Sequence, residues 1–147
     1  MIIKSLEQLN FFSKKVANHL NEKDCIFLIG EIGVGKTTFT RFLINYLQKK
    51  EDSKISEVLS PTFNLLYEYD LKKYKIMHYD LYRLKEEKEL NNLGIFRENQ
   101  NVIKIIEWPN LIKIPIAEKL EIHLDYTKHD NERKIKLIGT GKWKNFK

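Results

Sequence analysis

The chain has 147 residues, of which 42% are hydrophobic and 12% aromatic, as in folded globular proteins rather than disordered ones. We interpret residues 1–147 as a single domain that is large enough to have a hydrophobic core. Its single cysteine, Cys25, excludes an intramolecular disulfide framework and a cysteine-rich metal site. Residues 1–10 contain no apolar stretch like that of a signal peptide, and no apolar run approaches membrane-spanning length. We therefore expect a soluble, cytoplasmic protein that does not enter a membrane.

The formal net charge is +6, and the C-terminal part of the chain carries much of it. Between Thr127 and Lys147, seven Lys or Arg residues stand against two acidic ones. Such a segment could contact nucleic acid or an acidic protein. It could equally be the solvated face of a lysine-rich chain. The sequence leaves both interpretations open.

The N-terminal residues predict a short edge strand followed by an amphipathic helix. The strand is expected at Ile2–Lys4, and Ser5 and Gln8 have the spacing of a capping box at a helix start. The apolar positions that follow recur at helical spacing: Leu6, Leu9, Phe12, Val16 and Leu20.

A phosphate-binding motif follows, in the context that such a motif requires. The apolar run Ile26–Ile29 predicts a buried strand, and Gly30–Thr37 fits the pattern G-x-x-x-x-G-K-[ST] without a gap. The residues after it predict a helix with one apolar face, formed by Phe39, Phe42, Leu43, Tyr46 and Leu47. Strand, tight loop and helix together predict a P-loop.

Each residue type in this loop has a physical role. Glycine lacks a Cβ, so the loop can adopt positive φ and bring its backbone N–H groups against phosphate oxygens, at the positive end of the helix dipole. The Lys36 ammonium can reach the β- and γ-phosphates, and the Thr37 hydroxyl is a suitable oxygen ligand for Mg²⁺. The residues predicted to bind the nucleotide are Gly30, Gly33, Val34, Gly35, Lys36, Thr37 and Thr38.

The remaining elements predict a mixed sheet. We expect strands at 57–59 and 102–106, an antiparallel hairpin over 64–71 and 74–82, and a helix over Lys85–Leu93 that ends at Gly94. Two further strands, at 120–126 and 135–138, are expected to pair. The predicted fold class is therefore α/β: a P-loop NTPase-like mixed sheet flanked by helices, with antiparallel hairpins.

Two carboxylates follow predicted strands and are candidates for the chemistry. Ligands of open α/β sheets bind at the carboxyl ends of the strands, where Asp80 and Glu107 stand. Glu107, after the more apolar strand, is our first choice for Mg²⁺ together with Thr37, and Asp80 is then predicted to orient the attacking water or a metal-bound water. With Lys36, these are the predicted catalytic residues. The structural alternative is that each carboxylate caps a strand end or pairs with Arg83.

Two other positions are open to two interpretations each, and two more have one interpretation. Thr62 could sense the γ-phosphate or be a turn residue, and Trp108 could pack in the core or lie at the rim of the site. His78 is interpreted as a packed strand histidine, because no His or Cys stands at metal-ligand spacing from it. The start of the first helix, near Ser5 and Leu6, is one candidate for the site of adenine.

Five segments, in this order and spacing, resemble the TsaE family. They are Gly30–Thr38 (GEIGVGKTT), Ser60–Phe63 (SPTF), His78–Leu84 (HYDLYRL), Leu93–Gly94 and Glu107–Pro109 (EWP). The P-loop alone is generic, but its combination with the other motifs is specific, and the resemblance covers about residues 5–126. Glu31, Ile32 and Tyr79 depart mildly from the usual family residues, which are Asp, Leu and Phe.

The resemblance implies a small bacterial P-loop ATPase of tRNA threonylcarbamoyladenosine synthesis. Such proteins work with TsaB and TsaD, the pair that transfers a threonylcarbamoyl group to adenosine beside the anticodon. In the family, the residues matching Thr37 and Glu107 are expected at Mg²⁺, and the one matching Asp80 is expected to matter for hydrolysis. ATP binding or hydrolysis is then expected to reset the partner complex between turnovers.

Three other functions remain as alternatives. A small P-loop kinase is one, although kinases usually close an arginine-bearing lid and this chain has four scattered arginines. A GTP-binding switch is the second, since Thr127–Asp130 is a weak form of the guanine-reading motif. The third is a tRNA-binding module, which the basic tail allows but no aromatic RNA-binding signature accompanies.

Overall fold

A computed structural model describes residues 1–97 and 101–147 of the chain. Its centre is one seven-stranded sheet in the order β1-β7-β6-β2-β5-β4-β3. The strands are β1 (Ile2–Ile3), β2 (Cys25–Ile29), β3 (Leu66–Asp70), β4 (Lys75–Asp80), β5 (Val102–Glu107), β6 (Lys119–Tyr126) and β7 (Arg133–Gly139). The helices are α1 (Leu6–Ala17), α2 (Lys36–Lys50), α3 (Lys88–Asn92) and the 3₁₀ turns η1 (Pro109–Leu111) and η2 (Gly141–Asn145).

The sheet has a parallel centre and antiparallel edges. β6, β2, β5 and β4 run parallel, whereas β3 pairs with β4, β7 with β6 and β1 with β7 in antiparallel register. The predicted α/β class with a mixed sheet and hairpins is therefore confirmed. Because the four central strands run in one direction, their carboxyl ends lie at the same edge of the sheet.

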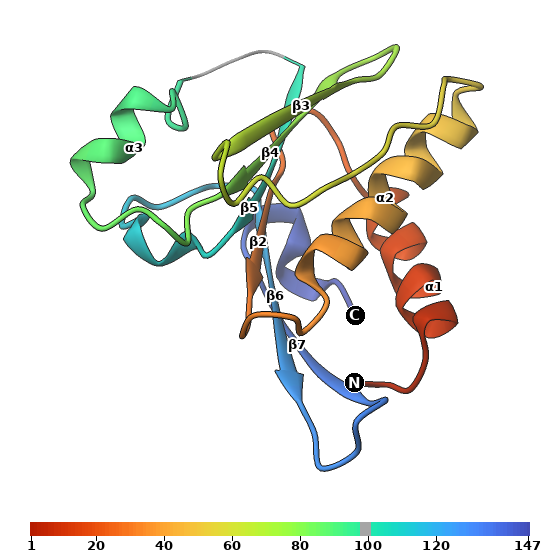
Figure 1. Cartoon of the computed structure of the whole chain (residues 1–147). Helices are drawn as coiled ribbons and strands as arrows, with labels where there is room; N and C mark the ends of the chain where they lie inside the picture. Colours follow the sequence, from red (N-terminus) through yellow and green to blue (C-terminus); the bar gives the residue numbers. More distant parts are fainter. Residues whose placement is uncertain (98–100) are drawn as a thin grey trace.

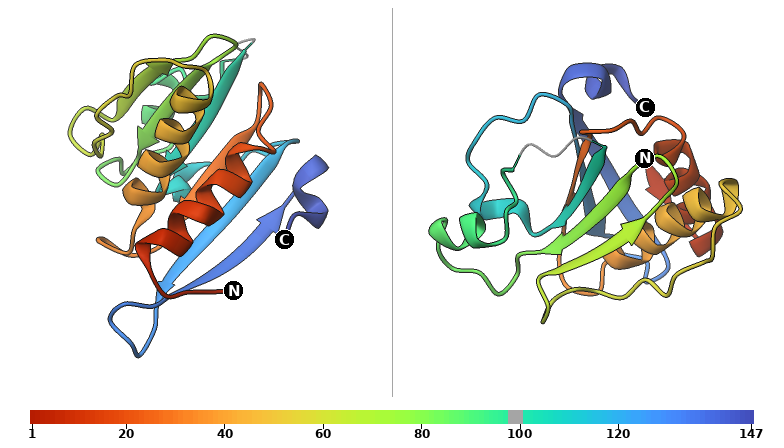
Figure 2. Two further views of the ribbon diagram at one scale, coloured as in Figure 1. Left: turned by 90° about the vertical axis from the view of Figure 1, so that its right-hand side faces the viewer. Right: turned by 90° about the horizontal axis from the view of Figure 1, so that it is seen from above.

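Helices α1 and α2 cover one face of the sheet, and α3 with the loops around it lies on the other (Figures 1 and 2). The strands alternate accordingly, because successive side chains point to opposite faces. In β4, Ile76 packs in the cluster beneath α1 and α2, whereas Met77 and Tyr79 pack in the cluster on the α3 side. His78 and Asp80 therefore point to the same face as Ile76, toward α2.

Helix α1 begins where the capping residues predict. The Gln8 backbone N–H donates to Ser5 Oγ at 3.2 Å, and the Gln8 side chain accepts from the backbone N–H of Lys4 rather than that of Ser5. Phe12 and Val16 are buried, but Leu6 is 67% exposed, although it has the same spacing. Among the described helices, none is long and apolar enough to cross a membrane.

Two predicted elements are wrong in their extent or type. Residues 57–59 form no strand, because side chains of α2 hold this part of the chain. Gln48 Nε2 donates to Ser56 Oγ, Gln48 Oε1 accepts from the Ser56 backbone N–H, and Arg41 Nε donates to Val58 O. The helix expected from Lys85 begins at Lys88, since the N–H groups of residues 85 and 86 are turned toward the Glu89 carboxylate instead. Its predicted stop is confirmed by Gly94, at φ 63°.

The C-terminal segment after β7 is fixed by a buried tryptophan. Trp143 is 1% exposed, its indole Nε1 donates to Asp24 Oδ1 at 3.2 Å, and its ring packs at right angles to Phe146. Lys142 forms an ion pair with the same Asp24. Part of the basic tail is therefore engaged within the fold. On β7, Lys134 stands opposite Asp125 of β6 in the antiparallel register.

We expect Trp143→Ala to lower the free energy of unfolding by about 3–5 kcal/mol, because it leaves a cavity and an unpaired buried Asp24 oxygen. Urea denaturation measures this change. The neighbouring exposed Lys144 supplies a control, since Lys144→Ala should alter stability by less than about 0.5 kcal/mol. A loss below 1 kcal/mol in Trp143→Ala would show that the C-terminal segment is not docked.

Candidate functional site

The P-loop joins the central strand β2 to helix α2, at the carboxyl edge of the sheet. Its backbone requires glycine at two points. At Gly30, φ is 152° and an added Cβ would lie 2.3 Å from Leu124 O. At Gly33, φ is 77° and a Cβ would lie 3.0 Å from the Tyr126 hydroxyl. A side chain at either position would displace the loop from the sheet.

Two side chains of the β6–β7 hairpin brace this loop from one side. The Tyr126 hydroxyl donates to Ile32 O at 2.9 Å, and Arg133 Nε donates to Val34 O at 3.1 Å. The Arg133 guanidinium also lies over the Tyr126 ring, 4.5 Å from its centroid. The loop conformation therefore depends on residues about 100 positions further along the chain, which the sequence motif did not reveal.

Lys36 extends from the start of α2 into the loop. Its Nζ donates to Gly30 O at 2.7 Å and Glu31 O at 2.8 Å, and it lies 4.3 Å from the centroid of the Trp108 ring. Burial lowers the pKa of Lys36, and the negative charges of Glu107 and Asp80 partly offset that effect. Lys36 therefore lines the same cavity as the two predicted carboxylates, Asp80 and Glu107.

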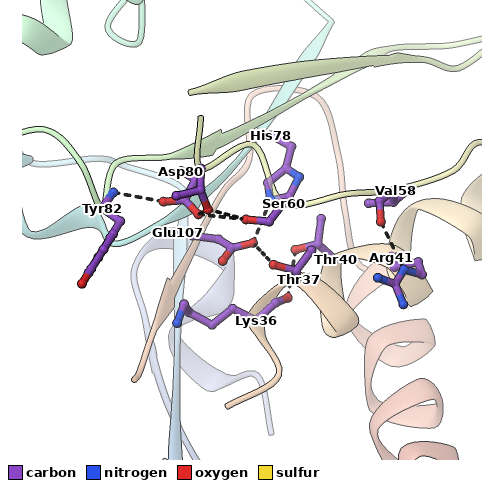
Figure 3. Close-up of polar contacts among 11 residues, drawn as sticks. Lys36, Thr37, Thr40, Arg41, Val58, Ser60, His78, Asp80, Tyr82 and Glu107 are labelled. Atoms are coloured by element: carbon purple, nitrogen blue, oxygen red, sulfur yellow. Dashed lines mark hydrogen bonds and ion pairs between the residues drawn. The ribbon is translucent and has the colours of Figure 1, made fainter. Parts of the chain in front are cut away.

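Glu107 ends β5 and is connected to two neighbours (Figure 3). It is 2% exposed, and its Oε1 accepts from Thr37 Oγ1 at 2.9 Å and lies 2.9 Å from His78 Nε2. The parallel pairing of β2 with β5 places Glu107 opposite Leu28, just before the P-loop. The two residues predicted to hold the metal, Thr37 and Glu107, are therefore in direct contact.

Asp80 ends β4 and stands opposite Glu107 in the β4–β5 register. Its Oδ2 accepts from Ser60 Oγ at 3.1 Å and Thr62 Oγ1 at 2.9 Å, and its Oδ1 accepts from the backbone N–H of Tyr82. Asp80 is not paired with Arg83, whose guanidinium lies over Phe63. The structure thus brings Ser60 and Thr62 to the carboxylate, a contact that the sequence analysis did not predict.

These groups line one cavity of about 320 Å³ at the carboxyl edge of the sheet. Trp108 stands at its rim, at φ 58° and with its ring 4.9 Å from that of Tyr82. The rim interpretation of Trp108 is therefore the one that the structure favours. The lining residues are Ile32, Gly33, Gly35, Lys36, Thr37, Thr38, Ser60, Thr62, Asp80, Tyr82, Glu107 and Trp108.

A second cavity, of about 420 Å³, adjoins the same loop on the side of α1. It shares Gly33, Gly35 and Thr38 with the first cavity, and its other walls come from the start of α1 and from the β6–β7 hairpin. Ser5, the candidate position for adenine, lines it. The P-loop therefore lies between two adjacent cavities, one lined by Asp80 and Glu107 and the other by the start of α1 and the β6–β7 hairpin.

Comparison with known proteins identifies the family. The family model described as "Threonylcarbamoyl adenosine biosynthesis protein TsaE" matches residues 3–135. The chain belongs to the TsaE family. This family takes part in tRNA threonylcarbamoyladenosine biosynthesis, so the resemblance inferred from the motifs is confirmed.

Individual TsaE proteins are similar over most of their length. The TsaE protein of Rickettsia conorii is 38% identical over 141 residues, which cover 94% of this chain and 76% of that protein. The TsaE protein of Aquifex aeolicus is 32% identical over 93% of both chains. The crystal structure of Bacillus subtilis YdiB superposes with a TM-score of 0.71 and 26% identity, covering 96% of this chain and 84% of that one. This likeness supports the P-loop NTPase-like fold.

Proposed function

We propose that this chain is the ATP-binding and ATP-hydrolysing component of the tRNA threonylcarbamoyladenosine machinery, and that it acts with TsaB and TsaD. The observation that carries the proposal is the meeting of the P-loop with Thr37, Asp80 and Glu107 in one cavity. In this arrangement a cradle of backbone N–H groups and a lysine stands on one side and two carboxylates on the other, as a triphosphate and its metal require.

The donor set fits Mg²⁺ bound together with a nucleotide. Among the described residues, no group of three His, Cys, Asp or Glu side chains could hold a metal ion by itself. Mg²⁺ in phosphate-transfer sites normally has few protein ligands, with nucleotide and water oxygens supplying the rest. Thr37 Oγ1 and Glu107 supply oxygens of the type it prefers, and the bound ion would neutralise charge on the phosphates.

Asp80 is proposed to position the attacking water. Its contacts with Ser60, Thr62 and the Tyr82 backbone hold the carboxylate in the cavity lined by the P-loop. With three donors already bound, the carboxylate has a fixed orientation, which a water-positioning group needs. Thr62 is placed by the same contact, and its hydroxyl faces the region proposed for the γ-phosphate.

We place the adenine in the second cavity, beside Ser5 and Leu6. This hollow is continuous with the P-loop, so a nucleotide could extend from one cavity to the other. Asp130 of the weak guanine-reading motif also lines this cavity, and this position is compatible with the GTP-binding alternative. Competition between ATP and GTP for the protein distinguishes the two, and we expect ATP to displace GTP.

We expect slow ATP hydrolysis by the isolated chain and faster hydrolysis in the presence of TsaB and TsaD. An arginine aimed at the transferred phosphate accelerates hydrolysis by about 10³–10⁵-fold in related chemistry, but the described lining of the carboxylate cavity contains no arginine. Steady-state phosphate release, with and without the partners, measures the difference. Fast turnover by the chain alone would contradict this prediction.

The kinase alternative is tested by a screen for phosphate transfer to small acceptors. A kinase transfers phosphate to an acceptor much faster than to water, and it closes arginines over the phosphates. Arg41 and Arg83, which lie nearest to the cavity in sequence, bind Val58 O and Phe63 instead. A screen of small acceptors that found efficient phosphate transfer would replace the proposed function with this one.

A further inference from the structure

His78 contacts Glu107, one of the two proposed metal ligands, from within the core. Its side chain is fully buried in the middle of the sheet, and its Nε2 lies 2.9 Å from Glu107 Oε1. The other ring nitrogen, Nδ1, is buried and has no hydrogen-bond partner among the described residues. The histidine thus makes one polar contact, and that contact is with Glu107 (Figure 3).

The pattern of partners indicates which nitrogen carries the proton. A carboxylate oxygen only accepts hydrogen bonds, so the nitrogen that faces it must donate. An unpaired N–H group in the core is costly, and the ring avoids this cost when Nδ1 carries no proton. His78 therefore has its proton on Nε2 and donates it to Glu107.

The two donors to Glu107 both meet the same oxygen. Thr37 Oγ1 and His78 Nε2 each lie 2.9 Å from Oε1, and no hydrogen bond to Oε2 occurs among the described residues. Thr37 is itself a proposed metal ligand, and its oxygen can bind the ion through a lone pair while its proton stays on Oε1. His78 does not line the cavity, so it is the donor that holds Oε1 in place without contacting the ion.

We propose that His78 is a positioning residue for the metal site, which anchors one oxygen of Glu107 so that the other is presented to Mg²⁺. This inference rests on the proposed function, because it requires Mg²⁺ to bind with ATP next to Glu107. Residues behind a metal ligand typically change metal affinity by about 10–100-fold when they are replaced.

The test compares two replacements of similar size. In His78→Met the donor is lost, whereas in His78→Gln the side-chain amide can place a donor close to the position of Nε2. Binding of the non-hydrolysable analogue β,γ-imido-ATP is measured calorimetrically in EDTA and over a series of free Mg²⁺ concentrations. The ratio of the affinities with and without Mg²⁺ reports the coupling between metal and nucleotide.

We expect this ratio to fall by about 10–100-fold in His78→Met and to stay near the wild-type value in His78→Gln. The affinity in EDTA should be similar in all three proteins, which also shows that the variants fold. A wild-type ratio in His78→Met would overturn the positioning role alone. Failure of the wild-type protein to bind the analogue at all would instead overturn the proposed function.

A spectroscopic measurement tests the same contact without metal. Nitrogen-15 NMR of the histidine rings distinguishes a protonated from a bare ring nitrogen, and His78→Gln identifies the signals of His78. We expect a proton on Nε2 and none on Nδ1. A bare Nε2 with the proton on Nδ1 alone would mean that His78 does not donate to Glu107, and the inference would fail.

Discussion

Replacing Lys36 by alanine should strongly weaken the binding of ATP. Lys36 is 5% exposed, and among the described residues that line the carboxylate cavity it is the one with a cationic side chain. Removing one member of a buried charge pair costs about 2–5 kcal/mol, which corresponds to about 30- to 5,000-fold in the dissociation constant. Calorimetric titration with ATP and Mg²⁺ measures the loss directly.

The control for this variant is Lys49→Ala, which removes the same charge from the exposed last turn of the same helix. It should bind ATP like the wild type. The functional readout is repeated tRNA modification in a mixture reconstituted with TsaB and TsaD. Equal support of repeated turnover by Lys36→Ala and wild type would refute the proposed mechanism, even though the fold is established.

Replacing Asp80 by asparagine should separate hydrolysis from binding. An asparagine can keep all three contacts, because its oxygen accepts from the Tyr82 N–H and its amide can donate to the hydroxyls of Ser60 and Thr62. Only the negative charge is lost. We expect kcat to fall by about 10²–10⁴-fold while the affinity for ATP changes little.

Single-turnover hydrolysis and calorimetry together measure these two quantities. Asp70→Asn is a matched control, because Asp70 is an exposed carboxylate at the end of the neighbouring strand β3. If Asp80→Asn instead loses the effect of Mg²⁺ on ATP affinity and keeps its rate, then Asp80 rather than Glu107 is the metal ligand. The roles proposed for the two carboxylates would have to be exchanged.

The strands and the P-loop could be predicted because their signals are local. The apolar run of β2, the glycines and the helix after them lie within one short segment, and the two carboxylates follow apolar strands of their own. Parallel pairing then places Asp80 opposite Glu107, as the rule for open α/β sheets requires. The roles of these residues in metal binding and hydrolysis stay predictions.

The parts that were missed depend on contacts between distant segments. The contact of His78 with Glu107 requires the β4–β5 register, and 29 positions separate the two residues in the sequence. The segment at 57–59 contains the apolar pair Val58 and Leu59, but bonds from side chains of α2 to Ser56 and Val58 take the place of a sheet ladder. Local strand propensity does not show whether a segment pairs in a sheet or bonds to side chains of a neighbouring helix. Sequence periodicity alone could therefore not predict that this segment forms no strand.

The brace of Tyr126 and Arg133 has a consequence for the whole molecule. Both residues bind P-loop carbonyls, and they stand opposite each other on either side of the β6–β7 turn. If nucleotide binding reorients the carbonyl of Ile32 or Val34, one of these bonds must break or the hairpin must shift with the loop. The conformation of the β6–β7 turn at the surface would then depend on whether nucleotide is bound. A partner protein could recognise that difference at the turn without contacting the phosphates.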